Sequence, residues 1–436
     1  MYALREYQSE SILSVGHRYA CGWNRMVINL PTGMGKTVIM CFLAAATEGK
    51  IVFIMHREEL IDQTIEKLGE ICPTRSIGKV KAEDKQVDAD LVVCSIQTLA
   101  ASPLTCAALG TPAMIMVDEC HHASTKSYMS ALRVLGAFDG VLTIGFTATL
   151  TRNDALGLGD VWQGVAYKRD VEWGERKGYI LPTRDVQIAV PSLDLSQVKQ
   201  SENEWGEIDY DATALGDALI NADAGKILAA EYKRRAGRKR GVVFCPTKKA
   251  AAVIAADFEA AGIRTGLITG DTPRDERRAM YADMRANRLQ VLVNVMVLTE
   301  GFDMPEIECV VIARVTRSQS LFVQMRGRGT RPCEDIGKTY CLLLDTVGAT
   351  VAHGKNVRPN LKRTGPPVPR VQRVKPPALV PAARRPSKAS YHARVSGRLV
   401  IVTRDGVEIA RKHAKEATVA PDLARLLIRA DQARRK

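Results

Sequence analysis

The sequence lacks the long apolar segments of a membrane protein and the leader of an exported one. Although 46% of its 436 residues are hydrophobic, no stretch of about 18 uncharged apolar residues occurs, the length that a membrane-spanning helix needs. The N-terminal MYALREYQSE has no apolar core of the kind found in signal peptides. These absences predict a protein with no membrane partner that stays in the compartment where it is made.

No two cysteines form a CxxC pair, the spacing that is typical of structural metal sites and redox centres. The ten cysteines are scattered singly, mostly within apolar runs: Cys21, Cys41, Cys72, Cys94, Cys106, Cys120, Cys245, Cys309, Cys333 and Cys341. This distribution predicts buried, reduced thiols and a cytoplasmic protein rather than a disulfide framework.

Acidic residues are scarce in one part of the chain only. The net charge is +14, but residues 355–436 hold 21 Lys and Arg against 5 Asp and Glu, a net charge of +16, which leaves −2 for residues 1–354. A basic appendage of this kind neutralises phosphates and releases counterions, so it predicts contact with nucleic acid. The alternative is a tail that only keeps the protein in solution.

Two series of short apolar runs predict two α/β domains in tandem. Each run is rich in Val and Ile and shows no polar alternation, which indicates strands buried on both faces of a parallel sheet. The first series is MVINL, IVFIMH, LVVCSI, AMIMVDE and VLTIGF, and the second is GVVFCP, LQVLVNV, ECVVIARV and TYCLLLD. Between them, over residues 151–240, the apolar runs become sparse.

We therefore expect a first domain over residues 1–185 and a second over 186–354, with the boundary within 182–192. Residues 355–390 are proline-rich and basic, which predicts an extended linker. Residues 391–436 predict a small basic module: RLVIVTRDGVEIAR indicates a hairpin with a turn at Asp405 and Gly406, and Pro421 begins an amphipathic helix. That helix carries Leu423, Leu426, Leu427 and Ile428.

The segment MVINLPTGMGKTVIM predicts a phosphate-binding loop between a strand and a helix. Gly33 and Gly35 allow the backbone to wrap a phosphate, Lys36 reaches the β- and γ-phosphate oxygens, and the Thr37 hydroxyl holds Mg²⁺. Leu30 stands where the GxxxxGK[ST] pattern has its first glycine. The expected cofactors are ATP and Mg²⁺, and the loop residues are Thr32, Gly33, Met34, Gly35, Lys36 and Thr37.

The run AMIMVDECHHA supplies the acids that a nucleoside triphosphatase needs at the end of a neighbouring strand. We expect Asp118 to complete the Mg²⁺ shell and Glu119 to orient and deprotonate the attacking water. Two acids that end a buried strand are costly unless a cation meets them. The adjacent His121 and His122 lack the further Cys or His spacing of a zinc site.

Eight segments, taken in order, resemble the conserved motifs of the superfamily 2 helicases. LPTGMGKT, DECH, TAT (residues 147–149) and QMRGRGTR resemble motifs I, II, III and VI. FIMHREELIDQ, CSIQTL, VVFCPTKKAA and NVMVLTEGFDMPEIE are similar to motifs Ia, Ib, IV and V. The resemblance covers residues 4–354, points to the bacterial and phage DEAD/DEAH-type DNA helicases that include the RadD-like group, and implies two RecA-like domains.

QMRGRGTR contains three arginines and no acid, which alone would indicate a solvated basic loop. The resemblance instead implies that Arg328 and Arg331 are arginine fingers that reach from the second domain to the γ-phosphate on the first. It also implies that Gln324 couples the two domains and that Gly327 lets their backbones approach closely. The other coupling residues that it implies are His121, Thr147 and Thr149.

LREYQ, near the start of the chain, is the expected base-selection segment. The Gln8 amide has the geometry to form two hydrogen bonds with the adenine edge, and Arg5 could pack on the ring. In the family that the chain resembles, a Gln at this place favours ATP over other nucleotides. The alternative is an ordinary surface helix start.

Polar residues that follow the apolar runs are the candidate nucleic-acid contacts, because parallel sheets bind ligands at the carboxyl ends of their strands. From position along the chain, they are His56, Arg57, Ser95, Gln97, Thr98, Thr247 and Lys248. By resemblance to motif V, Thr299 and Gly301 contact the nucleic-acid backbone and Asp303 senses the nucleotide.

The sequence thus predicts an ATP-dependent helicase or translocase that acts on nucleic acid in a bacterial or phage-infected cell. The resemblance favours DNA over RNA, since no residue is identifiable as a reader of the 2′-hydroxyl. Two alternatives stay open: the motor subunit of a restriction system, and an ATP-gated clamp that does not unwind. A catalytically inactive scaffold is disfavoured because Lys36, Asp118, Glu119, Arg328 and Arg331 are all present. The C-terminal module is a candidate docking site for a protein partner.

Overall fold

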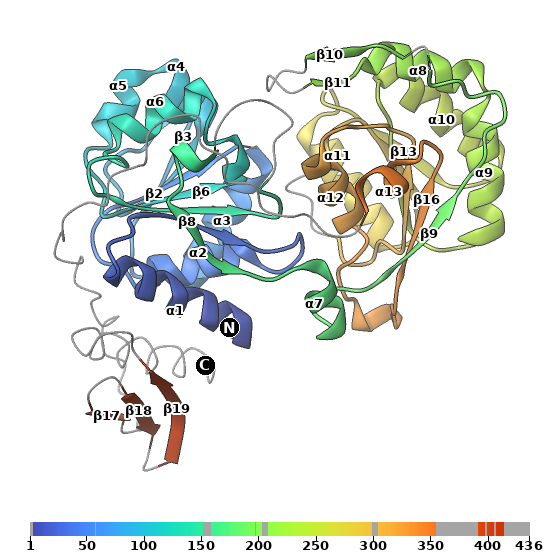
Figure 1. Ribbon diagram of the computed structural model, residues 1–436. Helices are drawn as coiled ribbons and strands as arrows, with labels where there is room; N and C mark the ends of the chain where they lie inside the picture. The colour runs from blue at the N-terminus through green and yellow to red at the C-terminus, as the bar shows by residue number, and fades with distance from the viewer. Residues whose placement is uncertain are drawn as a thin grey trace.

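The computed structural model describes residues 3–56, 58–150, 158–196, 198–202, 208–298, 304–354, 391–396, 399–404 and 407–413. Two α/β lobes lie side by side, with the short helix α7 (Val171–Arg176) near their junction (Figure 1). Each lobe is built on its own mostly parallel sheet. The prediction of two α/β domains in tandem is therefore confirmed.

The first lobe contains an eight-stranded sheet in the order β4-β3-β5-β2-β6-β7-β1-β8, parallel except for the pairing of β3 with β4. All five predicted strands of this lobe are present, together with three that the sequence did not reveal. The strands are β1 (Arg25–Asn29), β2 (Ile51–Met55), β3 (Ile77–Lys81), β4 (Asp84–Lys85), β5 (Leu91–Ser95), β6 (Met114–Asp118), β7 (Leu142–Thr147) and β8 (Gly164–Lys168).

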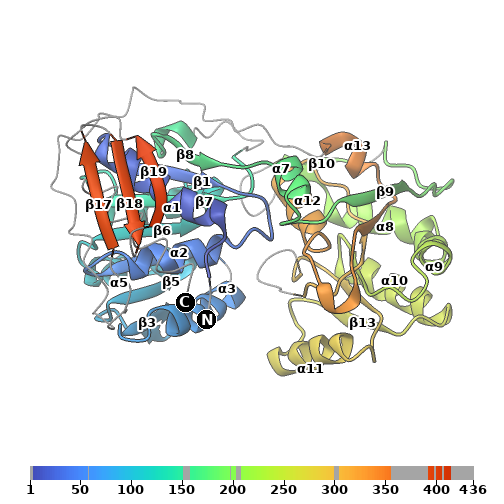
Figure 2. The ribbon, with the colours of Figure 1, turned by 90° about the horizontal axis from the view of Figure 1, so that it is seen from below.

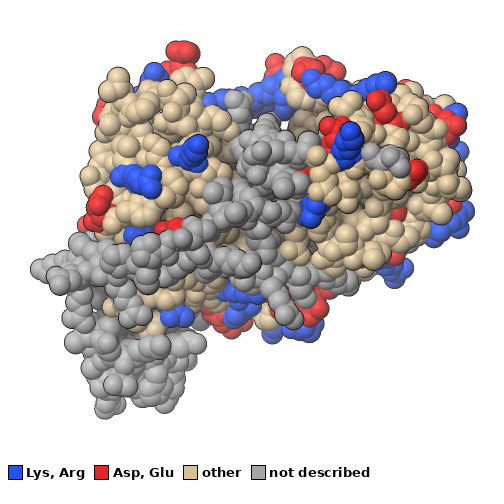
Figure 3. All heavy atoms as spheres, turned by 45° about the horizontal axis from the view of Figure 1, so that its top comes forward, with Lys and Arg blue, Asp and Glu red and all other residues tan. Residues whose placement is uncertain are grey.

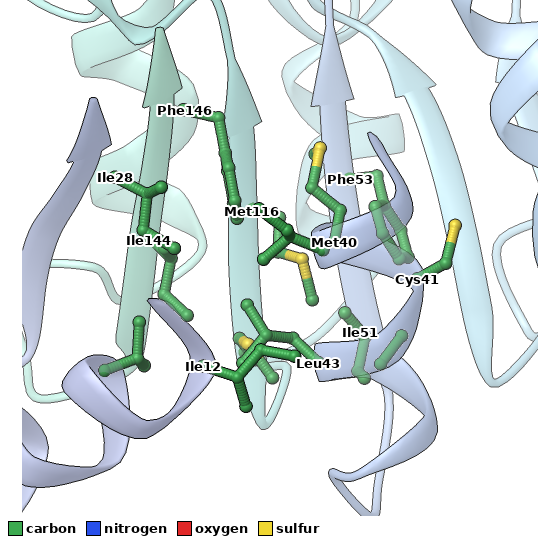
Figure 4. Packing of buried hydrophobic residues seen from close by; sticks show 14 of the residues in the cluster. Ile12, Ile28, Met40, Cys41, Leu43, Ile51, Phe53, Met116, Ile144 and Phe146 are labelled. Atoms are coloured by element: carbon green, nitrogen blue, oxygen red, sulfur yellow. The ribbon is translucent and has the colours of Figure 1, made fainter. Parts of the chain in front are cut away.

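Helices cover both faces of this sheet, which is why its strands lack polar alternation. Successive residues of β1 point to opposite faces: Ile28 packs with α1 and α2, and Val27 packs in the cluster that includes α4 and α6. Figure 4 shows the first of these clusters, where Ile12 and Leu43 lie against the strands. The helices are α1 (Glu6–Ala20), α2 (Lys36–Ala45), α3 (Glu58–Ile71), α4 (Ile96–Ala101), α5 (Pro103–Ala108) and α6 (Lys126–Val134).

The second lobe contains a six-stranded, all-parallel sheet in the order β13-β14-β12-β15-β16-β9. Its edge strand β9 pairs with β16, so the expected boundary between residues 185 and 186 falls inside a strand of the second sheet. The strands are β9 (Thr183–Gln187), β12 (Gly241–Phe244), β13 (Thr265–Ile268), β14 (Val291–Asn294), β15 (Cys309–Ile312) and β16 (Cys341–Asp345).

The residues between the two apolar series contribute to the core of the second lobe. Leu215 and Leu228 from this region are buried against the sheet, so the sparse apolar pattern still supplies two packed helices. A small antiparallel pair, β10 (Gln200–Glu202) and β11 (Ile208–Tyr210), precedes them. The helices are α8 (Ala212–Asn221), α9 (Ala224–Arg235), α10 (Lys248–Ala260), α11 (Arg274–Arg285), α12 (Gln319–Gly327) and α13 (Ala349–His353).

The C-terminal module contains the predicted hairpin and one further strand. β18 (Leu399–Arg404) pairs antiparallel with β19 (Val407–His413), and β17 (Tyr391–Ser396) adds to the other edge of β18. Figure 2 shows this three-stranded sheet. The turn at Asp405 and Gly406, the linker and the helix predicted from Pro421 lie outside the described residues.

Eight of the ten cysteines are buried, as expected, and none forms a disulfide. Cys21 is exposed and Cys333 is half-buried, and both lie in loops. Among the described helices, none is long and apolar enough to cross a bilayer.

Candidate active site

The strand order places the candidate ATP-site residues at adjoining strand ends. β6, β7 and β1 are neighbours in the parallel sheet, so their carboxyl ends meet at one edge. Asp118 ends β6, Thr147 ends β7, and the loop LPTGMG follows β1. The Leu30 amide donates to the Thr147 carbonyl at 3.1 Å, which fixes the start of that loop against β7.

The loop has the shape of a phosphate cradle. Gly33 and Gly35 have positive φ values of 85° and 67°, a conformation that residues with a Cβ rarely adopt. The Thr32 hydroxyl is buried and has no hydrogen-bond partner within the described protein. Lys36 begins α2, and its ammonium donates to the Leu30 carbonyl at 3.3 Å. The loop therefore offers an unused hydroxyl, a cation and a helix N-terminus to one ligand.

Helix α1 lies directly against this loop, as the expected base-selection role requires. The Tyr7 hydroxyl and the Gln8 amide donate to the Met34 carbonyl at 2.8 and 3.5 Å. Gln8 also accepts a hydrogen bond from the Arg5 amide at 2.9 Å. The Arg5 guanidinium lies over the ring of Tyr179, 5.3 Å from its centre.

Aromatic residues also gather beside this loop, which no sequence motif indicated. Tyr179 lies 4.7 Å from Tyr7 and 5.5 Å from Trp173, measured between ring centres. Tyr179 and Trp173 come from the segment after β8, which matched none of the helicase motifs. The cluster forms an apolar wall next to the phosphate cradle.

The carboxylate of Glu119 belongs to a buried polar network. Its Oε2 lies 3.3 Å from His121 Nδ1 and 3.3 Å from the Thr147 hydroxyl, and these two partners lie 3.0 Å from each other. The Thr147 hydroxyl also accepts from the Thr149 amide at 3.1 Å. The DECH and TAT segments thus share one network, as their expected coupling role requires.

This network keeps Glu119 ionised. Burial raises the pKa of Glu119, but the hydrogen bond from His121, the Lys36 charge and the Thr147 hydroxyl outweigh it and lower the pKa to about 2. A group whose pKa lies below its usual value stays charged, and keeps its partners, until the pH falls toward that lower value. At neutral pH the side chain is therefore an anion whose oxygens accept hydrogen bonds.

The second lobe contacts the first at this same site. Ser320 Oγ on α12 lies 3.1 Å from His121 Nε2, so His121 joins Glu119 to the other lobe. A Cβ placed on Gly327 would lie 2.6 Å from Thr32 Cβ, and one placed on Gly33 would lie 3.2 Å from Arg331 Cγ. Ala148, between the two threonines of TAT, packs against the core of the second lobe. Arg331 and Gly327 are thus next to the cradle.

The other side chains of QMRGRGTR are also buried. Gln324 and Arg328 are 4% and 5% exposed. Arg326 has a different place: its guanidinium donates to the Thr183 hydroxyl at 2.7 Å and lies 3.8 Å from Glu175. It therefore faces the connection between the lobes.

Lys338 supports the loop that carries Arg331. Its ammonium donates to the carbonyls of Arg331 and Pro305 at 2.9 and 2.8 Å. Burial lowers the pKa of Lys338 to about 8. Neither Lys338 nor Ser320 was identified from the sequence, although Ser320 lies four residues before Gln324, which puts both on one face of α12.

The candidate nucleic-acid residues that the structure describes do lie at carboxyl ends of strands. Ser95 ends β5 and hydrogen bonds Gln97 at 2.7 Å, and Gln97 donates to the His56 carbonyl at 3.0 Å. Thr98 accepts from the Ala82 amide at 3.0 Å. In the second lobe, Thr247 caps α10 and Lys248 forms an ion pair with Asp271. Arg57, Thr299, Gly301 and Asp303 lie outside the described residues.

Three histidine rings connect these residues to the Glu119 network. His56 and His122 have ring centres 5.4 Å apart, and His122 and His121 have theirs 4.1 Å apart. All three are buried. Within the described residues, no group of His, Cys, Asp and Glu has the arrangement of a metal site.

Known protein families match both lobes. Residues 1–152 match the family described as "Type III restriction enzyme, res subunit", and residues 223–333 match the "Helicase conserved C-terminal domain". The "Putative ATP-dependent helicase IRC3" of Saccharomyces cerevisiae is 28% identical over 80% of this chain and 52% of the yeast protein. The "51.5 kDa protein" of a Lactococcus phage is also 28% identical, over 75% of this chain and 67% of its own length.

The chain spans about half the length of the yeast relative. A solved fragment of "a putative HsdR subunit of a type I restriction enzyme" from Vibrio vulnificus has the same fold. It superposes with a TM-score of 0.62 at 20% identity, over 82% of this chain and 66% of that one. Two helicase-related families are matched in this order on one chain, and helicase relatives align over most of it, which supports a superfamily 2 helicase of the DEAD/DEAH type.

Proposed function

We propose that this protein is an ATP-driven motor that moves along DNA and separates or remodels its strands. The main support for the proposal is that two halves of one site, each on a different lobe, lie in contact. A phosphate cradle and a buried carboxylate on the first lobe lie against the arginine-bearing segment of the second. A site divided between two domains is completed when they close and is broken when they open, so hydrolysis is coupled to domain movement.

The cradle fits a nucleoside triphosphate with Mg²⁺. The free hydroxyl of Thr32, the left-handed glycines and the ammonium of Lys36 suit phosphate oxygens. Thr37, in the first turn of α2, and Asp118 would hold Mg²⁺, which neutralises charge on the phosphates. Arg5 and Gln8 would bind the adenine, with Tyr179 as an additional apolar wall.

Glu119 would accept the proton of the attacking water. Because it is ionised, the carboxylate can also orient that water by accepting a hydrogen bond from it, and His121 and Thr147 hold the carboxylate in place. His121 would also report the position of the second lobe through Ser320. Gln324, one turn further along α12, and Thr149 would take part in the same coupling.

Arg328 and Arg331 would stabilise the charge that develops on the transferred phosphate. The closeness of Arg331 to Gly33 of the cradle supports this role for Arg331. The burial of Arg328 at the end of α12 supports the same role for Arg328. Guanidinium groups supplied across a domain interface are an established device for phosphoryl transfer. Asp303, by resemblance, would sense the nucleotide from the same lobe.

A nucleic-acid strand would cross the carboxyl ends of both sheets. His56, Ser95, Gln97 and Thr98 would contact it from the first lobe, and Thr247 and Lys248 from the second. Arg57, Thr299 and Gly301 complete the set by resemblance. Because the ring of His122 lies beside those of His56 and His121, strand binding at His56 would reach Glu119 through neighbouring, tilted rings.

A second candidate function is the motor of a restriction system. The family matched by residues 1–152 and the Vibrio vulnificus structure both carry restriction-enzyme names. Such a motor would move on duplex DNA without separating strands, and a nuclease would come from elsewhere. Both functions favour DNA, and in both the C-terminal module could also bind a protein partner.

Strand displacement measured beside ATP hydrolysis tests the proposed function. Single-stranded, duplex and forked DNA and an RNA duplex would be compared as activators and as substrates. Displacement of a forked DNA strand that requires ATP supports the helicase. Hydrolysis stimulated by duplex DNA without displacement supports the restriction-type motor, and stimulation by RNA alone would contradict both.

We predict that Lys36→Ala and Glu119→Gln both abolish turnover but differ in ATP binding. Lys36 holds the phosphates, so its loss should weaken ATP binding by about tenfold or more, the worth of one charge-assisted hydrogen bond. Glu119 serves the water, so Glu119→Gln should bind ATP within about threefold of wild type. Equilibrium binding of a fluorescent ATP analogue measures both. Equal loss of ATP binding in the two variants would show that the role assigned to Glu119 is wrong.

Arg328→Ala and Arg331→Ala should each slow ATP hydrolysis by about a thousandfold, the range of arginine-finger loss. ATP affinity should change far less, because the cradle lies on the first lobe. Arg326→Ala is the matched control, since Arg326 faces Thr183 and Glu175. The measurement is the steady-state rate of ATP hydrolysis at saturating ATP and nucleic acid. If the Arg328 and Arg331 variants are no slower than the Arg326 variant, the two residues are not arginine fingers.

The basic tail should supply much of the non-specific affinity for DNA. Its net charge is +16 against −2 for residues 1–354, and the described Lys and Arg side chains on the face seen in Figure 3 are interspersed with acids. Each phosphate neutralised releases counterions, which makes binding fall with salt. Ending the chain after Gly354 should preserve basal hydrolysis but weaken DNA binding and flatten its salt dependence.

Anisotropy titrations of both proteins with labelled DNA at several salt concentrations measure this effect. Equal affinities and equal salt slopes would show that the tail does not bind DNA. That result would leave a protein partner of the module as the better account of residues 391–436.

A further inference from the structure

One carboxylate joins the two lobes on the side where the nucleic-acid strand is expected. Asp62, on α3 of the first lobe, forms an ion pair with Arg274, the first residue of α11 in the second lobe. The other oxygen of Asp62 accepts from the Lys79 ammonium at 3.0 Å. Each oxygen of Asp62 is thus bound to a cation from a different lobe.

This cluster lies among the candidate phosphate contacts. Helix α3 follows β2 and His56, and Lys79 is the central residue of β3. The turn from β3 to β4 is joined to Thr98 by the hydrogen bond from the Ala82 amide. Helix α11 follows β13, three residues beyond the Asp271 that pairs with Lys248. Figure 2 shows α3 and α11 on the same side of the two lobes.

The positive charges around Asp62 stabilise a negative charge at its position. Burial raises the pKa of Asp62, but the hydrogen bond and charge of Lys79, with the charges of Arg274 and Lys81, lower it below its usual value. Asp84 lies 3.9 Å from Lys79 on the far side. Three cations therefore surround Asp62, with one further acid nearby, and at neutral pH Asp62 is the anion that they bind.

The ion pairs are open enough to be exchanged. The side chains of Asp62, Lys79 and Arg274 are 29%, 23% and 58% exposed. Ion pairs at this level of exposure contribute little to folding stability because water solvates the separated charges well. A phosphodiester carries the same charge as a carboxylate and presents two unesterified oxygens, so it can take over both cations.

We propose that Lys79 and Arg274 form a phosphate-binding subsite shared by the two lobes, and that Asp62 occupies it in place of a nucleic-acid phosphate until a strand binds. The proposal rests on the proposed function, which puts the strand on this side of the molecule. Because the two cations belong to different lobes, one phosphate binds both only when the lobes are arranged as they are here. The subsite therefore makes strand binding sensitive to the closure that also assembles the ATP site.

Asp62→Asn and Arg274→Gln test the subsite in the full-length protein. Asp62→Asn keeps the shape of the side chain and removes the competing charge, so it should bind a labelled 20-nucleotide single-stranded DNA about three- to tenfold more tightly. Arg274→Gln should bind it about three- to tenfold more weakly and reduce the salt slope by about one.

Glu231→Gln on α9 is the matched control. It removes one acid from exposed ion pairs with Arg234 and Arg235, so the net charge changes equally at a place far from the strand. A general effect of charge would tighten DNA binding as much in Glu231→Gln as in Asp62→Asn, and would overturn the proposal. A gain in affinity confined to Asp62→Asn supports it, since misfolding does not strengthen binding.

The failure of this proposal is distinguishable from the failure of the proposed function. Wild-type protein that binds the DNA, together with Asp62→Asn and Arg274→Gln variants that bind it equally well, would overturn the subsite alone. Wild-type protein that binds neither this DNA nor a duplex of the same length would overturn both.

Discussion

The arrangement of the site depends on how closely the second lobe approaches the phosphate cradle. At Gly327 no side chain fits, because a Cβ there would lie 2.6 Å from the Cβ of Thr32. At Gly33 a Cβ would meet Arg331 at 3.2 Å. With a glycine on each side of the contact, the two backbones come near enough for the cradle and the arginine-bearing segment to bind one ligand. A site of this kind is complete in only one arrangement of the lobes.

The same contact holds the proposed catalytic base. Glu119 has a φ of 45°, a left-handed conformation that costs a residue with a side chain about 1–3 kcal/mol. His121 and Thr147 hold its carboxylate, and Ser320 from the second lobe holds the opposite nitrogen of His121. Movement of α12 therefore changes the environment of Glu119 directly. The position of the second lobe is thus linked to the carboxylate through two side chains, and the tilted ring of His122 extends this link toward His56.

The sequence predicts the features that consecutive residues encode. It does not predict which side chains from distant segments come into contact. Strands buried on both faces have continuous apolar runs, and all nine that were predicted are present. Edge strands lack that pattern: β9 reads TRDVQ with three exposed positions, so the expected boundary fell inside it. The cradle and the DECH acids were found because their residues are consecutive. Ser320 and Tyr179 were missed, since only tertiary packing shows which residue meets His121 or Arg5.

Gly327→Ala measures most directly whether close approach of the lobes assembles the site. Gly327 is helical, and Ala is favoured over Gly in a helix by about 1 kcal/mol, so the substitution should harm only the contact with Thr32. Gly69→Ala is the control, because Gly69 is an exposed helical glycine with open space around it. The account predicts that Gly327→Ala binds ATP like wild type but hydrolyses it about tenfold or more slowly under nucleic-acid stimulation, whereas Gly69→Ala does not. Hydrolysis at the wild-type rate by Gly327→Ala would contradict the account.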